Sequence, residues 1–187
     1  MKKTYICQQI PGTKQEQLRM LVYRSLPSGA AVAVGTADCR SDGDDYTEMV
    51  ISWRDRKLFY SDISVPMKYK RNDFISNFPN GEKIAVEYRL FGQMQQQFLQ
   101  YASRMFQVVC PRAENCKLSE VWVYEYDPTS PVDQFRMKPF IRIQPRVSKG
   151  ILYWSVQIPE EYNEELCMIL ATLPLTLNLE HFIYYSR

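Results

Sequence analysis

The stretch that most constrains the fold is GQMQQQFLQYASRMFQVV, in which Gly92 is followed by Gln93–Val109. Six of its apolar side chains recur mostly at spacings of three and four residues, which places them on one stripe of an α-helix. These residues are Met94, Phe98, Tyr101, Ala102, Met105 and Val108. Glutamine, serine and arginine side chains supply most of the remaining surface, and Pro111 would end the helix. The pattern therefore predicts a central helix.

Strand patterns lie on both sides of this predicted helix. Residues 46–53 alternate between two faces with a period of two, as a half-buried strand does. Residues 30–37 are small and apolar enough to form a buried strand. By the same reasoning, strands are expected at 4–10, 30–37, 46–53, 58–63, 83–90, 119–126, 140–147 and 151–158. The last two would form a hairpin across residues 148–150.

A second helix is expected near the N-terminus of the chain. Thr13 and Glu16 have the spacing of a capping box. The apolar positions that follow form a stripe, and Pro27 closes the segment. Residues 73–78 fit one further helical turn.

A third helix is expected near the C-terminus. The run of glutamates from Glu160 to Glu165 suits the start of a helix, where the helix dipole favours carboxylates. Pro174 would end this helix, and the alternating residues 175–185 predict a final buried strand. The chain is therefore expected to have an α+β fold, with a mainly antiparallel sheet of hairpins and two to three helices packed on one face.

The bulk composition indicates one globular domain, residues 1–187. With 187 residues, of which 45% are hydrophobic, the chain can bury a core without metals or disulfides. The proline-rich stretch 127–139 is a candidate for a mobile loop. A net charge of +2 argues against a polycationic nucleic-acid binder. Without a signal peptide or membrane-spanning pattern, and with five scattered cysteines, the sequence favours a reducing cytoplasm and free thiols.

The common catalytic and cofactor motifs are missing from the sequence, so we expect neither a cofactor nor a metal. His181 is the single histidine and stands in an apolar row, which favours a structural role. Cys110 and Cys116 lack the paired ligands that tetrahedral zinc needs. The acidic loop 38–45 departs from the calcium-loop pattern and is interpreted as a solvated turn.

One candidate binding site is basic and aromatic. Residues 136–149 contain five cations and no acid, and an inward orientation of Ile141 and Ile143 would place the residues between them on an outer face. The candidate binding residues are Arg136, Lys138, Phe140, Arg142, Gln144, Arg146, Lys149 and Tyr153. Rings that stack, guanidiniums that bind phosphate and amides that read bases are what single-strand binders use. A second basic cluster consists of Lys68, Tyr69, Lys70 and Arg71.

Three functions from different classes remain open. The first is a non-enzymatic interaction or assembly protein, with itself or another protein as the partner. Abundant tyrosine, phenylalanine and methionine fit this function and are common in viral and mobile-element accessory proteins. The second is binding of single-stranded nucleic acid or another polyanion through residues 136–153. Alternatively, the arginines of this segment bind nothing and only protect an exposed sheet edge from aggregation. The third is a cysteine-dependent enzyme that uses Cys110, Cys116 or His181.

Overall fold

The structure, a computed structural model, describes residues 2–12, 17–41, 46–64, 72–77, 83–91, 94–111, 120–127, 129 and 138–185. The strands are β1 (Lys2–Gln9), β2 (Gln17–Ser25), β3 (Ala31–Ser41), β4 (Tyr46–Trp53), β5 (Arg56–Ser64), β6 (Asn72–Asn77), β7 (Lys83–Phe91), β8 (Met94–Tyr101), β9 (Arg104–Pro111), β10 (Val121–Tyr126), β11 (Ile141–Ile143), β12 (Arg146–Ser148) and β13 (Ile151–Pro159). The helix is α1 (Glu164–Tyr185).

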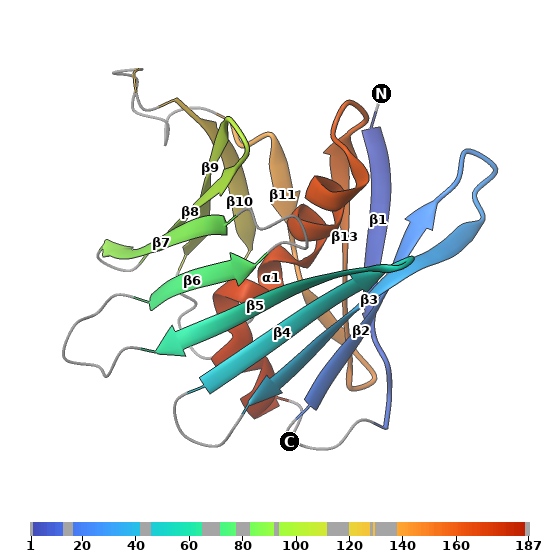
Figure 1. The fold of residues 1–187 in the computed structure, drawn as a ribbon. Coiled ribbons are helices and arrows are strands. Elements are labelled where there is room, and N and C mark those ends of the chain that lie inside the picture. Colours follow the sequence, from blue (N-terminus) through green and yellow to red (C-terminus); the bar gives the residue numbers. More distant parts are fainter. Residues whose placement is uncertain are drawn as a thin grey trace.

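The described strands form one antiparallel sheet in the order β11-β10-β9-β8-β7-β6-β5-β4-β3-β2-β1-β13-β12. Strands that follow each other in the sequence are therefore neighbours from β1 to β11, as expected for a chain of hairpins. The sheet curves around α1, which lies against its concave side (Figure 1). This arrangement confirms the predicted antiparallel sheet, but the described residues contain one helix instead of two to three.

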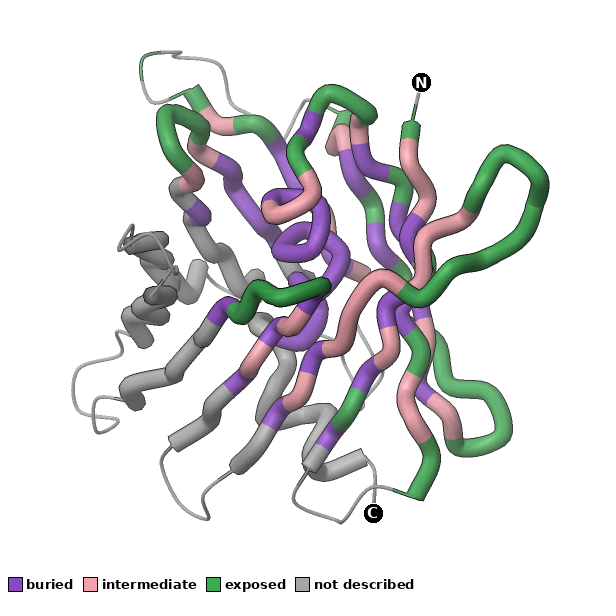
Figure 2. The backbone as a smooth tube through the Cα atoms, turned by 45° about the vertical axis from the view of Figure 1, so that its right-hand side comes forward, coloured by how far each residue is buried: buried purple, intermediate pink, exposed green. Residues whose placement is uncertain are grey.

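Residues 166–175 of helix α1 lie in the core because all of them except Thr172 are apolar. Every side chain in this stretch is buried, including that of Thr172. Thr172 Oγ1 donates a hydrogen bond to the Met168 carbonyl at 2.9 Å. A helix without a polar face is stable only when it is enclosed, and α1 contacts β1, β2, β3, β4, β8 and β13. Figure 2 shows this buried helix inside the sheet.

Helix α1 continues through Pro174, and side chains of the sheet donate hydrogen bonds to the helix turn that precedes this proline. A proline inside a helix removes one backbone donor and disturbs the preceding turn. In that turn, the Ala171 carbonyl accepts hydrogen bonds from Trp154 Nε1 at 2.8 Å and from Cys7 Sγ at 3.4 Å. The predicted C-terminal strand at 175–185 is therefore wrong. Within the described residues, no helix is long and apolar enough to cross a membrane.

The predicted central helix is also wrong, because residues 94–111 form the β8–β9 hairpin. Tyr101 pairs with Arg104 across a turn in which Ala102 has φ 51°. Leu99, Phe106 and Val108 are buried in the core. The hairpin buries Leu99 and Phe106, which do not belong to the predicted helical stripe, and pairing with β7 and β10 stabilises the strands.

The helix expected near the N-terminus and the helical turn expected at 73–78 are strands as well. In β2, Leu18, Met20 and Val22 are buried at alternating positions. Residues 72–77 form β6 instead of a helical turn. The capping-box residues 13–16 and most of the loop 127–139 lie outside the described residues. By contrast, the strands expected at 46–53, 58–63, 83–90 and 151–158 correspond closely to β4, β5, β7 and β13.

The predicted strand at 140–147 is divided into two short strands. β11 pairs with β10, whereas β12 pairs with β13, so they lie at opposite ends of the strand order. The break falls at Gln144 and Pro145, and Pro145 lacks the backbone N–H that a continuous strand would use. Ile141 and Ile143 are buried as expected, whereas Val147 on β12 is 56% exposed.

Candidate functional site

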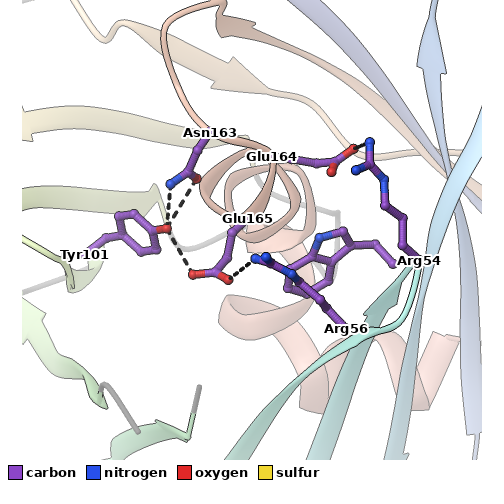
Figure 3. Close-up of a pocket in the computed structure, with 7 residues that line it drawn as sticks. Arg54, Arg56, Tyr101, Asn163, Glu164 and Glu165 are labelled. Carbon is purple, nitrogen blue, oxygen red and sulfur yellow. Dashed lines mark hydrogen bonds and ion pairs between the residues drawn. The ribbon is translucent and has the colours of Figure 1, made fainter. Parts of the chain in front are cut away.

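A polar cleft of about 370 Å³ lies at the start of α1 (Figure 3). It is lined by Trp53, Arg54, Arg56, Tyr101, Asn163, Glu164 and Glu165. Three separate segments meet there: the β4–β5 turn, the end of β8 and the first turn of α1. The sequence patterns do not bring these segments together, so the cleft was not among the predicted sites.

Two tight turns position the sheet side of the cleft. In the β4–β5 turn, Arg54 has φ 50° and Trp53 pairs with Arg56. The β8–β9 turn similarly places Ala102 at φ 51°, directly after Tyr101. Non-glycine residues adopt such left-handed conformations at tight turns that reverse a strand. The turns therefore direct two arginines and one tyrosine toward the helix.

Asn163 forms the helix side of the cleft and caps α1. Its Oδ1 accepts a hydrogen bond from the Leu166 backbone N–H at 2.8 Å, which satisfies one of the free donors of the first turn. Its Nδ2 donates to the Tyr101 hydroxyl at 2.8 Å, and that hydroxyl donates to Glu165 Oε1 at 3.0 Å. The cap is thus connected to the sheet.

Two ion pairs complete the network. Arg54 Nη2 lies 3.2 Å from Glu164 Oε1, and Arg56 Nη1 lies 3.6 Å from Glu165 Oε2. The arginine side chains are 72% and 66% exposed, so each pair contributes at most about 1 kcal/mol to stability. Both carboxylates already have cationic partners and lie in a helix first turn that favours them. This arrangement suits anchoring of α1 better than acid–base catalysis.

The described thiols do not form a reactive site. Cys7, Cys39 and Cys167 are free and buried. Burial raises the pKa of all three thiols, so the nucleophilic thiolate is disfavoured at neutral pH. The side chains of Cys110, Cys116 and His181 lie outside the described residues, so a role for them in catalysis remains a prediction. Among the described residues, no cluster of His, Cys, Asp and Glu could hold a metal ion.

The structure brings together only some of the residues of the basic and aromatic binding site that was predicted within residues 136–153. Arg142 is exposed, and its guanidinium lies 5.6 Å from the centre of the Trp122 ring and 3.4 Å from Glu120 Oε1. The predicted combination of a guanidinium with an aromatic ring therefore occurs, although the ring comes from β10 and the arginine has an acidic neighbour.

Phe140 does not share the outer face with Arg142, which corrects the geometry assumed for the site. Its ring packs 6.0 Å from Phe106 and 6.3 Å from Tyr162, against the core. The divided strand also separates Arg142 on β11 from Arg146 on β12.

The remaining predicted binding residues are placed as follows. Gln144 is exposed and accepts a hydrogen bond from Arg146 at 3.0 Å, Lys138 and Lys149 are exposed, and Tyr153 is half-buried. Arg136 and the second cluster, residues 68–71, lie outside the described residues. Whether these side chains bind anything remains a prediction.

A third feature is an exposed hairpin that we call the arm, consisting of the end of β2, the turn after it and the first part of β3, residues 23–35. It projects from the body of the sheet (Figures 1 and 2). Every residue from Leu26 to Ala33 is exposed, including Leu26 at 39% and Val32 at 47%. The prediction that residues 30–37 form a buried strand is therefore wrong for the first half of that range. No residue from Ser25 to Ala37 carries a charge, a signal that was visible in the sequence.

Comparison of the chain with protein-family models, with curated proteins and with solved structures finds no match.

Proposed function

We propose that this protein is a non-enzymatic interaction protein that assembles with protein partners, itself included, through the arm. The observation that carries the proposal is an exposed, uncharged and apolar strand with one unpaired edge. Exposed apolar surface of this kind is uncommon in isolated proteins and is typical of docking surfaces.

The arm is shaped by a specific break in the sheet. The β2–β3 register shifts between Val22 and Tyr23, so that Val34 is the extra residue of a β-bulge. Next to it, Gly35 lets β3 approach β4 and α1: a Cβ at this position would clash with the Ser52 carbonyl and would lie 2.7 Å from Met168 Cε. A bulge bends its strand, and beyond it the arm leaves the core.

The free edge of the arm follows from the strand pairing. The ladder between β3 and β4 begins at the pair Thr36–Ser52. Of the described strands, only β2 pairs with the part of β3 that precedes Thr36. This leaves backbone donors and acceptors available to an added strand, the mode of recognition known as β-augmentation.

The edge strand β12, at one end of the strand order, is protected by contrast. Strand β12 is three residues long, and it carries Arg146 with Lys149 in the turn that follows. Short length and cations are the usual means by which proteins prevent pairing at a sheet edge. The arm has neither protection along Ala31–Val34, which supports the view that it pairs with a partner.

The proposal is tested by light scattering coupled to size exclusion over a wide concentration range. We expect wild-type protein to form a defined oligomer. A variant in which residues 25–31 are replaced by Asn-Gly should be monomeric, because a two-residue turn can join Arg24 to Val32, which form a hydrogen-bonded pair, and it removes the outer part of the arm. Arg146→Gln is the control and should leave the mass unchanged. A wild-type monomer at every concentration, or an oligomer that survives removal of the arm, would contradict the proposal.

Binding of single-stranded nucleic acid or another polyanion is the second candidate. It is favoured by the exposed Arg142 above the Trp122 ring, with Lys138, Arg146 and Lys149 also exposed. Fluorescence anisotropy of a labelled single-stranded oligonucleotide tests it. Binding should weaken steeply with salt and should fall in the double variant Arg142→Gln, Arg146→Gln. Binding that is unaffected by this double variant would remove the candidate.

A further inference from the structure

The strand pairing identifies which backbone groups of the arm are free. The Leu26 N–H donates to the Ala30 carbonyl at 2.8 Å, so these two residues form a hydrogen-bonded pair. Ser25 lies opposite Ala31, Arg24 opposite Val32, and Tyr23 opposite Ala33. Because hydrogen-bonded and non-hydrogen-bonded pairs alternate along an antiparallel ladder, Val32 directs its N–H and C=O toward β2. The N–H and C=O of Ala31 and Ala33 therefore point outward, toward the free edge.

Val32 is the last residue in a row of cross-strand partners, and the first residues of that row are buried in the core. Cross-strand partners share a face, and the register aligns Val156, Tyr5, Arg24 and Val32 on four neighbouring strands. Val156 and Tyr5 are buried, Arg24 is half-buried and Val32 is 47% exposed. On the other side of Val32, no described strand pairs with β3 to continue this row. An apolar side chain on an added strand would cover Val32.

We infer that the partner of the arm is a second copy of the chain, with the two β3 strands paired antiparallel about a twofold axis at Val32. This inference rests on the proposed function. In this register Ala31 faces Ala33 of the other copy, and Ala33 faces its Ala31. Each of these pairs is hydrogen-bonded in both directions, which gives four hydrogen bonds from the outward-pointing groups. The two Val32 side chains meet at the axis and cover each other.

Charge and size favour a second copy over an unrelated peptide. The free edge carries no charge, so it offers no counter-ion to a charged peptide and does not repel an identical edge. The two Arg24 side chains would be separated by three strand spacings, about 14 Å, which exceeds the screening length of about 8 Å at physiological salt. The facing alanines are small, so the backbones can approach without steric conflict.

The projecting arm also suits a closed dimer. Because the arm extends away from the sheet and helix (Figure 1), two arms can overlap while the bodies lie on opposite sides of the axis. A twofold axis uses the same edge of both copies, so the interface closes at two subunits and leaves no further unpaired arm. Strand pairing without closure would instead lead to open aggregation.

Disulfide trapping in the full-length protein tests the register. At a non-hydrogen-bonded pair the Cα atoms lie about 4.5 Å apart, within disulfide range, so Val32→Cys should cross-link two chains under mild oxidation. Ala31→Cys is the matched control, because the two Ala31 Cα atoms would be about 8 Å apart, beyond the reach of a disulfide. We expect at least tenfold more cross-linked dimer from Val32→Cys than from Ala31→Cys or wild type. Peptide mapping should locate the bond between the two introduced cysteines.

A proline variant provides a second, independent test. Ala33→Pro removes an outward-pointing N–H that β2 does not use, so the arm should fold while dimer formation is lost. Val32→Thr keeps a β-branched side chain and should retain the dimer. Near-ultraviolet circular dichroism that matches wild type shows that the body is intact.

The outcomes of these experiments distinguish the proposed function, assembly through the arm, from the inferred dimer register at Val32. An oligomer that depends on the arm but neither cross-links at Val32→Cys nor responds to Ala33→Pro would overturn this register and leave the proposed function intact. A monomer in every preparation, with no excess cross-linking at Val32→Cys, would overturn both. A dimer that cross-links through the introduced cysteines and dissociates in Ala33→Pro would support both.

Discussion

At the residue scale, Gly35 holds three elements at close range, and its substitution should test that packing. A Cβ at Gly35 meets the Ser52 carbonyl, which belongs to a strand backbone and cannot rotate away as a side chain can. We expect Gly35→Ala to destabilise the protein by about 1–3 kcal/mol, the usual cost of overpacking. Urea denaturation measures this loss. Ala31→Ser, at an exposed position of the same strand, should change stability by less than about 0.5 kcal/mol.

The buried thiols predict how stability depends on alkaline pH. Burial raises the pKa of Cys7 and Cys39 above their ordinary value of 9.0, and burial likewise raises that of Tyr5. The folded state therefore holds these protons more tightly than the unfolded state does. Their contribution to stability is complete below pH 9 and decreases as pH rises through the unfolded-state pKa, by up to about 1.4 kcal/mol per pH unit for each group.

Urea denaturation between pH about 8 and about 10.5 measures this dependence. The denaturation midpoint should be steady at the lower end and fall at the upper end. In the double variant Cys7→Ala, Cys39→Ala the fall should be shallower, because two of the responsible protons are absent. A midpoint that rises with pH would show that these groups are ionised in the folded state, contrary to their burial.

At the element scale, the start of α1 depends on Asn163. Asn163→Ala removes the cap on the Leu166 N–H and should destabilise the protein by about 0.5–2 kcal/mol in urea denaturation. Asn163→Ser separates the two roles of the residue, since serine still caps a helix but cannot reach the Tyr101 hydroxyl. We expect Asn163→Ser to recover most of the loss. Equal losses in both variants would assign the effect to the contact with Tyr101.

The elements also show how far sequence patterns can predict this fold. The strands with clean alternation, such as 46–53, are confirmed by the structure. Residues 94–109 were assigned to a helix because six of their apolar side chains fall at helical spacing, whereas pairing with β7 and β10 across the sheet makes them strands. Pro174 was interpreted as a helix end, yet burial on all sides and the bonds to Ala171 maintain the helix through it.

At the scale of the whole molecule, the sites depend on contacts that a sequence does not display. The cleft combines Arg54, Tyr101 and Asn163 from segments far apart in the chain. The arm depends on a bulge near Val34 that directs an apolar segment outward, so a run that resembles a buried strand is exposed. Composition led to the hypothesis of an interaction protein, whereas the surface that we propose for this role could be recognised only in the fold.

Salt dependence separates the two candidate functions in the intact protein. Pairing of the two uncharged β3 edges relies on backbone hydrogen bonds and apolar contact, so the mass measured by light scattering should be the same at low and high salt. Binding of a polyanion through Arg142 and its neighbours releases counterions and should weaken steeply as salt increases. We expect wild-type protein to keep its oligomeric mass at high salt, with an absorbance ratio at 260 and 280 nm typical of free protein. Salt that both reduces the mass and strips bound nucleic acid would instead identify the basic residues as the site of assembly.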